Sequence, residues 1–351
     1  MGTLADIGRA TSPAHLPSAP DPHSVLTGDP CDIVVLACRA PSVHNTQPWR
    51  WRVEDTTLEL YADRSRALAA ADPSGRNLAL SCGAALHHAQ VAARALGWVP
   101  DVTRLPDPAQ PDLLARIRLR RGEAAQADRT ARADHSDPAG DLQAIRERRT
   151  DRRRFTSWPV PPERLDHLAS EAREHGGPGE PVVDAAARFR LELLIGRAMS
   201  AQEGDDGLLA EQRAWIDHSR DDGIPSASVP EVGLGALRRH RFAQGGIGSA
   251  REPVEASDGV LVLGGPDDTT GSWLRTGEGL SALWLLATRT GLAVVPLSQV
   301  VEVDETRHAL QHDVLGDRMV PHLVVRVGWL EISRSTHHAT PRRPLDDVLL
   351  P

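Results

Sequence analysis

Two adjacent stretches near residue 50 alternate between apolar and polar side chains, and this alternation predicts a β-hairpin. Trp49, Trp51 and Val53 are separated by arginines, which is the period of two expected of a strand with one buried face. A turn signal follows at residues 55–56, and the alternation then resumes. The pattern recurs over residues 114–120, where apolar residues alternate with arginines. We therefore expect antiparallel strands that pack one face on a core.

Two longer stretches, residues 77–96 and 272–290, are apolar around most of a helical circumference and stop at a glycine. A helix without a wide polar face is usually buried. At an offset of 194 residues, four positions match: Gly83 with Gly277, Leu86 with Leu280, Ala93 with Ala287 and Gly97 with Gly291. One interpretation is that any two buried helices with a glycine stop look this similar. The other is a duplicated domain whose central helices pack together as dimer subunits do.

The rest of the chain contains further predicted strands and helices, which together indicate an α+β fold. Further strands are expected at residues 102–105, 259–263, 292–295 and 323–327, and further helices ending near residues 40 and 148, beginning within 158–163 and covering 189–202. We expect a flexible arm at residues 1–30 and two halves, 31–140 and 141–351, joined by a charged linker at 122–140. Each half is expected to form a mainly antiparallel sheet wrapped by helices. Residues 203–250, polar and rich in glycine, are expected to form a lid or a disordered segment.

The composition excludes several classes of partner. The formal net charge of −8 gives no general attraction to nucleic acid or to an anionic membrane. All 40 basic residues are arginine, which we attribute to the coding bias of a GC-rich genome and which leaves no lysine for a Schiff base. The three cysteines are spaced neither as a disulfide framework nor as a zinc site. Without a recognisable signal peptide or an apolar run of about 20 residues, we expect a cytoplasmic protein.

The loop Ala40–Trp49 (APSVHNTQPW) is the first candidate site. Its two prolines interrupt any helix, and Ser42, Asn45 and Gln47 supply hydrogen-bond donors and acceptors of both kinds. One edge of a flavin ring also presents both kinds, so the loop is a candidate cofactor site with Trp49 as a wall. A generic turn has a similar composition, and composition alone does not separate the two.

A run of arginines that starts at Arg148 is the second candidate. On a solvated helix end such a run is an ordinary hydrated surface. Thr150 lies within it, however, and a hydroxyl beside guanidinium groups suits phosphate oxygens. A second pair, Arg342-Arg343, lies between prolines near the C-terminal end. Two separate basic clusters in an acidic chain favour a single phosphate group over a polyanion.

Other constellations are weaker. His308 and His312 have the spacing of metal ligands on a helix, but no HExxH motif surrounds them and a solvated helix face explains them better. The histidine pairs at 87–88 and 337–338 lack ligand partners at fixed spacing, and residues 245–248 are glycine-rich but follow no strand. Hydrolase, P-loop and dinucleotide-fold interpretations all lack their motifs. We expect no metal site.

Taken in order, these motifs resemble a known family. APSVHNTQPWRW resembles the Pro-Ser-x-x-Asn-x-Gln-Pro-Trp motif of the nitroreductases, RRTDRRRF their Arg-Arg-Ser/Thr-x-Arg start, and TPRRPLDDVL their basic C-terminal segment. The order and length are most similar to the Acg-like branch of actinobacterial proteins, in which two nitroreductase-type halves are fused. The resemblance covers roughly residues 30–350 and implies an FMN-binding α+β fold whose two halves mimic a homodimer.

The resemblance also implies residue roles. It assigns the isoalloxazine ring to Ser42, Asn45 and Gln47. The phosphate-binding set that it implies is Arg148, Thr150, Arg152 and Arg343, with Arg342 as a further candidate. Pro296-Leu297-Ser298-Gln299 matches the segment whose backbone approaches flavin N5. One site between the halves is complete, whereas its mirror lacks both the arginine run and the PSxxNxQPW motif, so we expect one FMN per chain.

The resulting hypothesis is an oxidoreductase that passes hydride from NADH or NADPH to FMN and electrons on to a small nitroaromatic or quinone. No side chain need act as an acid or base, because the flavin carries the chemistry. The oligomeric state is expected to be a monomer or a homodimer. The alternative is an FMN-sequestering protein with little turnover. Two departures bear on the choice: Val43-His44 replaces the second serine of many active members, and residues 203–250 could cover the flavin.

Overall fold

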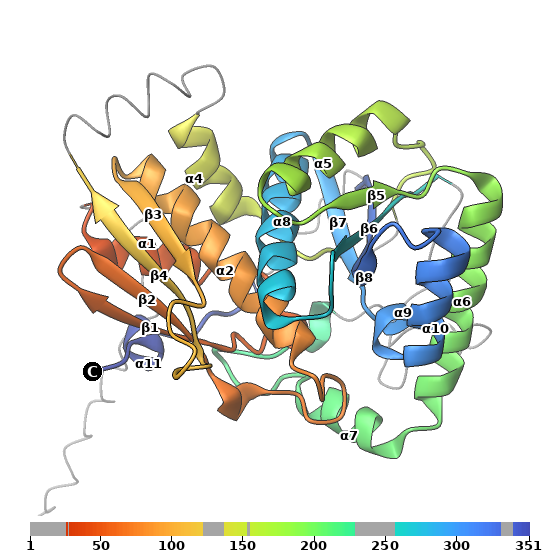
Figure 1. The fold of residues 1–351 in the computed structure, drawn as a ribbon, viewed down its shortest axis with the longest axis horizontal. Coiled ribbons are helices and arrows are strands. Elements are labelled where there is room, and N and C mark those ends of the chain that lie inside the picture. Colours follow the sequence, from red (N-terminus) through yellow and green to blue (C-terminus); the bar gives the residue numbers. More distant parts are fainter. Residues whose placement is uncertain (1–25, 27, 122–136, 153–154, 229–256, 331–339) are drawn as a thin grey trace, which may run out of the picture.

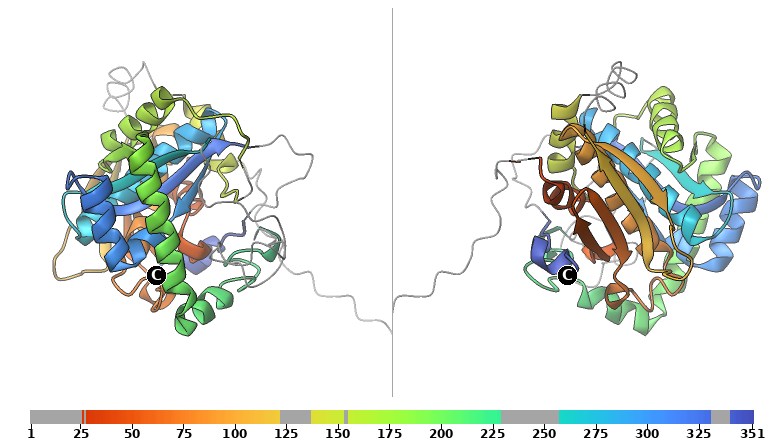
Figure 2. Two further views of the ribbon diagram at one scale, coloured as in Figure 1. Left: turned by 90° about the vertical axis from the view of Figure 1, so that its right-hand side faces the viewer. Right: turned by 60° about the vertical axis from the view of Figure 1, so that its left-hand side comes forward.

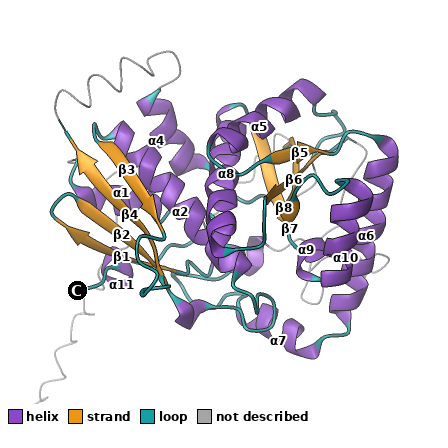
Figure 3. Ribbon diagram, viewed as in Figure 1, coloured by secondary structure: helices purple, strands orange, loops and turns teal. Residues whose placement is uncertain are grey.

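The computed structural model describes residues 26, 28–121, 137–152, 155–228, 257–330 and 340–351. These residues form two four-stranded sheets with helices between and around them (Figure 1; Figure 3). The first sheet contains β1 (Trp49–Glu54), β2 (Thr57–Ala62), β3 (Val99–Arg104) and β4 (Leu113–Arg120), and the second contains β5 (Gly179–Pro181), β6 (Gly259–Gly265), β7 (Leu292–Leu297) and β8 (Val320–Trp329). The longer helices are α1 (Pro30–Ala37), α2 (Arg76–Ala95), α4 (Pro138–Glu147), α5 (Pro162–Glu174), α6 (Ala185–Glu203), α7 (Asp206–Ala214) and α8 (Thr270–Arg289).

Both sheets have the same strand order. The first runs β1-β2-β4-β3 and the second β5-β6-β8-β7, and every neighbouring pair is antiparallel. The predicted α+β class with two mainly antiparallel sheets is therefore confirmed. A repeated strand order is also what a duplicated domain would produce.

The two sheets differ in how many faces they bury, and the sequence pattern of each strand follows from this. In β1, Trp49 and Trp51 are fully buried against α1 and α2, and the arginine that separates them is half-buried on the other face. In β6, Leu261 and Leu263 face α5 and α8, while Val260 and Val262 lie in a second core with α6. A strand with helices on both faces is apolar throughout, which explains the continuous run predicted as a buried strand.

Helices α2 and α8 lie side by side in the middle of the molecule, with one sheet on either side (Figures 1 and 2). Gly83 of α2 and Gly277 of α8 form the contact. A Cβ on Gly83 would overlap the Leu274 carbonyl group, 2.9 Å from its carbon, and a Cβ on Gly277 would overlap that of Leu80 at 2.8 Å. These contacts map onto each other under the offset of 194 residues, as an isologous interface requires. The helices predicted to pack together do so.

Polar groups also meet between these helices. Glu278, almost fully buried, accepts two hydrogen bonds from Arg104 at 2.7 Å and one from Gln90 at 2.7 Å. His87 and His88 of α2 each place Nδ1 2.8 Å from the Ser281 hydroxyl of α8. Because each of these contacts joins residues far apart in the chain, the interface is specified by hydrogen bonds as well as by close packing.

Segments that follow the first sheet in sequence complete its core. Ala144 and Ile145 of α4 and Val348 of α11 (Leu345–Val348) follow the first sheet in sequence, yet all three are buried in the core beneath that sheet. The C-terminal residues run beside β1, where the Leu350 amide donates to the Trp51 carbonyl at 2.6 Å. The first core is thus completed by the end of the chain.

Several elements were not predicted. Helix α9 (Gln299–Glu302) and strand β5 are too short to show a period. The helix expected around His308 and His312 is present as α10 (Asp304–Ala309), which continues into a π-helical turn (Leu310–Val314). Helix α7 lies inside the segment expected to be a lid. The expected arm, most of the linker, Arg153, Arg154 and the second half of the expected lid lie outside the described residues. Within the described ranges, no helix has the length and apolarity to cross a membrane.

Candidate functional site

The loop that follows α1 has an unusual backbone. His44, Asn45 and Gln47 have φ values of 47°, 55° and 49°. A left-handed conformation is uncommon for a residue other than glycine, and three within four residues mark a strained segment of the kind found at functional sites. Ser42 stabilises the turn, because its hydroxyl accepts the Gln47 amide at 2.9 Å. The Val43 amide donates to Ser81 of α2 at 3.1 Å, which fixes the loop to the helix interface.

A pocket opens beside this loop, between the two halves. Its space, counted with the solvent at its mouth, is about 870 Å³, within the range of small-molecule sites. The lining comes from separate parts of the chain: residues 41–44, α2, the segment after α4, α8, β8, the end of β7 and the two residues that follow it. The lining residues are Pro41, Ser42, Val43, His44, Asn77, Leu80, Ser81, Thr150, Arg152, Leu280, Trp284, Val295, Pro296, Leu297, Ser298, Gln299 and Leu323.

Five of the predicted site residues lie in this lining: Ser42, Thr150, Arg152, Ser298 and Gln299. They come from segments more than 100 residues apart in sequence. Pro296 and Leu297, from the predicted N5-facing segment, lie in the same wall. The structure thus brings together residues that sequence motifs alone connected.

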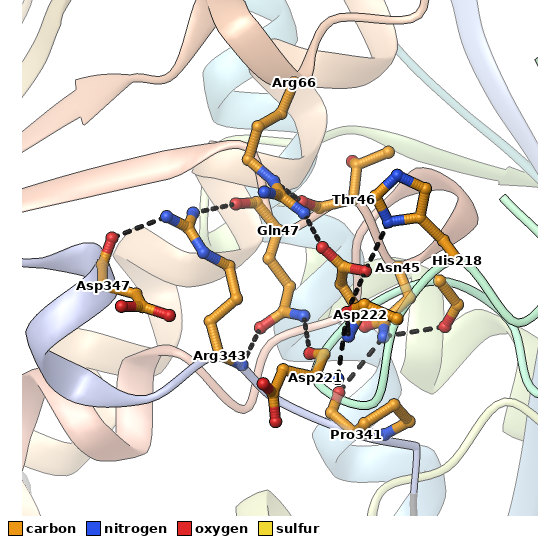
Figure 4. A network of polar contacts seen from close by, with 12 residues as sticks. Asn45, Thr46, Gln47, Arg66, His218, Asp221, Asp222, Pro341, Arg343 and Asp347 are labelled. Atoms are coloured by element: carbon orange, nitrogen blue, oxygen red, sulfur yellow. Dashed lines mark hydrogen bonds and ion pairs between the residues drawn. The ribbon is translucent and has the colours of Figure 1, made fainter. Parts of the chain in front are cut away.

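Asn45 and Gln47 do not line the pocket, contrary to the expectation that their side chains face a ring. The Asn45 amide donates to the Gly223 and Pro341 carbonyls at 3.0 and 3.1 Å. The Gln47 amide donates to the Asp221 carbonyl at 2.9 Å and accepts the Arg343 amide at 2.9 Å (Figure 4). Both side-chain amides therefore connect the loop to residues 221–223 and to residues 341–343, and they do not face the cavity.

The segment after α7, residues 215–224, supplies the first of these contacts. Asp222 forms an ion pair with Arg66 and accepts from His218 Nδ1 at 2.7 Å, as Figure 4 shows. The His218 ring stacks on Trp215 with ring centroids 4.3 Å apart. Residues 215–224 of the second half therefore dock on the loop of the first half. Of the described residues 203–228, none lines the pocket.

Arg343 is also placed differently from the expectation. Its guanidinium donates to the carbonyls of Gln47 and Asp347 at 3.2 and 2.6 Å and lies 3.6 Å from Asp63. A carboxylate and two carbonyls already engage this group, so it acts as a brace between the C-terminal segment and the loop.

Arg148 and Arg342 belong to a cluster of four arginines with Arg39 and Arg149, here called the arginine cluster. The Arg39 carbonyl accepts from Arg148 at 3.2 Å and from Arg342 at 3.1 Å. Within the described part of the chain, none of the four forms an ion pair with a carboxylate. Arg148 is 3% exposed and lies over the ring of Trp284, a pocket residue, at 4.9 Å from its centroid. The arginine cluster therefore adjoins the pocket.

Electrostatics in the arginine cluster disfavour charge on its members. Burial, followed by repulsion from Arg342, Arg149 and Arg39, holds the pKa of Arg148 well below its usual value. Burial and the charges of Arg39 and Arg149 lower the pKa of Arg342 to about 9. Arginine stays protonated in proteins, so these shifts express the free-energy cost of holding the cations together. Nε and Nη1 of Arg148 and Nε of Arg342 are buried and have no hydrogen-bond partner among the residues that the structure describes. An anion would satisfy both the charge and the donors.

Sequence reasoning missed three residues of this site. Asn77 and Trp284 line the pocket from α2 and α8. Both lie within apolar helical stretches, so the sequence pattern predicted only that they are buried in the core. Arg39 joins the arginine cluster from the end of α1, where a lone arginine gave no signal. Asn77 was the most detectable of the three, because an amide in a buried helix needs a partner.

The weaker candidates form no site. Among the residues that the structure describes, no three His, Cys, Asp or Glu side chains are grouped as metal ligands. His312 pairs with Asp317 at 2.6 Å on the surface, and His308 is exposed. The pair at 337–338 and the glycines at 245–248 lie outside the described residues.

Comparison with other proteins places these observations in context. No protein-family model matches the chain. Two proteins of Mycobacterium tuberculosis strain H37Rv, Rv3131 and acg, each carry the name "Putative NAD(P)H nitroreductase" and are each 36% identical to it. The first alignment covers 97% of this chain and 94% of the relative, and the second 93% and 97%. Rv3127 of the same strain, named uncharacterized, is 34% identical over 90% of this chain and 91% of its own.

Solved structures align less closely. A nitroreductase-type protein from Anabaena variabilis aligns with a TM-score of 0.40 and 14% identity over 84% of this chain and 82% of its own. The FMN-dependent nitroreductase NfnB from Mycobacterium smegmatis, solved with NADPH, aligns with a TM-score of 0.37 and 18% identity over 56% of this chain and 95% of its own. The relationship therefore rests on the sequence relatives, which match over nearly their whole length.

Proposed function

The chain belongs to the nitroreductase family, in its Acg-like branch, and from this premise we propose that it binds one FMN in the pocket between its halves. The activity we propose is the NAD(P)H-dependent reduction of a nitroaromatic or a quinone. Relatives named NAD(P)H nitroreductases at 36% identity support the class of reaction. The choice of FMN is supported by the motifs that resemble those of the family and by the chemistry of the pocket and its surroundings.

The observation that carries the proposal is the meeting of the pocket and the arginine cluster. The pocket is mainly apolar with polar groups at a few points, as a planar aromatic ligand requires. The adjoining arginine cluster combines buried cations with unsatisfied donors. A ligand with an aromatic ring and a phosphate monoester would satisfy both parts of this site.

We assign the phosphate mainly to Arg148, whose Nε and Nη1 are unsatisfied, and the ring to Ser42, Ser298 and Gln299. Arg39 and Arg342 are additional members of the phosphate site, Arg342 only through Nε, because its Nη atoms already donate to Asn45 Oδ1 and to four carbonyls. Thr150 and Arg152 also line the pocket. Asn45, Gln47 and Arg343 hold the loop in its strained form. When bound, the flavin supplies the hydride and electron transfer, and the protein positions and shields it.

A single cofactor per chain is supported by the mirror position. Arg104 stands 194 residues before Ser298, at the place that the internal repeat would give a second site. There it forms a two-bond ion pair with the buried Glu278. A paired arginine and glutamate fill the position that the other half uses for a ligand.

The visible absorption spectrum of the purified protein tests the cofactor, with the flavin identified after release by heat. Oxidation of NADH or NADPH with an added nitro compound then tests the activity. Tight flavin binding without turnover would favour the second candidate, a flavin-sequestering protein. That candidate is supported by Val43 and His44, which stand in the pocket lining where many active members carry a second serine. A colourless protein that does not bind added FMN would contradict both.

Replacing Arg148 by methionine should weaken FMN binding and stabilise the flavin-free protein. The affinity for FMN is expected to fall about 10- to 100-fold, since charge-assisted hydrogen bonds to phosphate are lost. The affinity for riboflavin, which lacks the phosphate, should stay within about twofold, because a methionine can still pack on Trp284. Flavin fluorescence titrations and thermal unfolding of the flavin-free protein measure the two effects.

Arg220→Met is the matched control, because the Arg220 side chain is 74% exposed and lies outside the pocket lining. It should change neither affinity. An equal loss of FMN and riboflavin binding in Arg148→Met would contradict the assignment of the phosphate to the arginine cluster.

A further inference from the structure

Asn77 presents an amide to the pocket from the first turn of α2. Asn77 is one of the pocket-lining residues and is only 6% exposed. Its backbone is fixed, because the amides of Asn77 and Leu78 donate to the two carboxylate oxygens of Asp72 at 3.0 and 2.9 Å. The neighbouring Arg76 binds Asp268 of the second half through two hydrogen bonds at 3.0 and 3.2 Å. The position of this amide is therefore set by both halves.

Glu302 of α9 determines which way the amide faces. Asn77 Nδ2 lies 3.1 Å from Glu302 Oε1. An asparagine amide can be turned over without changing its shape, and its orientation follows from its partners. A carboxylate offers only acceptors, so the NH₂ group must face Glu302 and the carbonyl oxygen must face the other way. Among the described residues, no hydrogen bond is donated to that oxygen.

Gln202 holds Glu302 in place. Its amide donates to the other carboxylate oxygen, Oε2, at 2.9 Å from the C-terminal end of α6. Glu302 is also the last residue of α9, and the first residue of α9, Gln299, lines the pocket. The chain Gln202–Glu302–Asn77 thus connects the second half to a polar group in the cavity wall.

We propose that Glu302, supported by Gln202, is a positioning residue that holds the Asn77 carbonyl toward the pocket as an acceptor for a ligand N–H group. The inference rests on the proposed function for the identity of the ligand. The oxidised isoalloxazine ring carries a single ring N–H, at N3, so this is the group that the Asn77 carbonyl accepts. Glu302 makes no contact with the ligand and acts through Asn77.

The test uses FMN labelled with ¹⁵N at N3, bound to the full chain. In the wild type, the N3–H proton should appear in the ¹H–¹⁵N spectrum and exchange slowly with water. In Glu302→Gln the partner can both donate and accept, so Asn77 is free to turn over. The N3–H exchange rate should rise at least about tenfold and FMN affinity should fall about five- to tenfold, the loss of roughly one hydrogen bond.

Glu305→Gln on α10, an exposed glutamate close in sequence, is the matched control and should change neither quantity. Gln202→Leu removes only the hydrogen bond that holds Glu302. It should raise the N3–H exchange rate and lower the FMN affinity by smaller factors, and it provides a second test if Glu302→Gln folds poorly. An N3–H proton that exchanges freely in the wild type would overturn the proposal. So would an N3–H proton that is as well protected in Glu302→Gln and Gln202→Leu as it is in the wild type. A wild type that binds no FMN would instead contradict the proposed function.

Discussion

Replacing Gly83 by alanine should destabilise the protein by about 3 kcal/mol or more, the upper end of the cost of overpacking a core. The added Cβ would overlap the Leu274 carbonyl group and lie 3.0 Å from the Gly277 Cα. Backbone atoms on both sides form the obstacle, so no side-chain rotamer relieves it. Relief requires α2 and α8 to move apart, which also opens the interface that lines the pocket. Urea unfolding at neutral pH measures the change.

A matched alanine substitution separates this steric effect from the intrinsic preference of alanine for helices. Gly196 lies in the interior of α6, and a Cβ there would meet nothing within 4 Å. Gly196→Ala should therefore stabilise the protein by about 0.5–1 kcal/mol. If Gly83→Ala were as stable as Gly196→Ala, the helices would not be in the close contact described above.

Acidification should destabilise the protein between pH 6.5 and pH 4, and His322 alone should account for about 3 kcal/mol of the loss. Burial lowers the pKa of His322 from 6.5 to about 4, although the Asp267 carbonyl favours the protonated ring. Since the folded pKa lies below the unfolded one, the unfolded state binds more protons in this range. The stabilisation is complete above pH 6.5 and disappears as the pH falls through the folded pKa. His87 and His88 should add to the loss, because burial holds the pKa of each well below 6.5.

Urea unfolding of the wild type and of His322→Gln at pH values from about 7 down to about 4.5 isolates this contribution. The variant loses the contacts of His322 with Thr276 and Asp267, both at 2.9 Å, so it starts from a lower stability at neutral pH. Its stability should then fall less steeply, and the gap between the two proteins should close as the pH decreases. His308→Gln, at an exposed position on α10, should keep the wild-type slope. Parallel curves for the wild type and His322→Gln would show that His322 does not carry the effect.

Much of the fold could be predicted because its strands and long helices have strong periods. The alternation at Trp49 and Trp51 follows from a sheet with one solvated face, and the continuous run of β6 from a sheet covered on both. The matched positions Gly83 and Gly277 indicated the central helix pair, since only glycine permits this approach. The short helix α9 escaped prediction because it contains little more than one turn.

The site could be predicted only in part, because a motif identifies residue types and not the directions of side chains. Ser42, Thr150 and Ser298 do line one pocket. Asn45 and Gln47 belong to the same motif as Ser42, but the left-handed turns at both positions direct their amides to residues 221–223 and 341–343. No local pattern around Asn45 or Gln47 indicates these partners, which lie more than 170 residues away in sequence.

The packing of C-terminal residues in the core of the first sheet has a consequence for synthesis of the protein. Domains of a growing chain generally fold from the N-terminal side as they emerge. Here the core beneath the first sheet includes Val348, and the Leu350 amide bonds to β1. The first half therefore lacks part of its core until residues 345–350 have been synthesised. Removing the residues from 340 onward should therefore expose apolar surface of the first core, which the binding of a hydrophobic dye would measure.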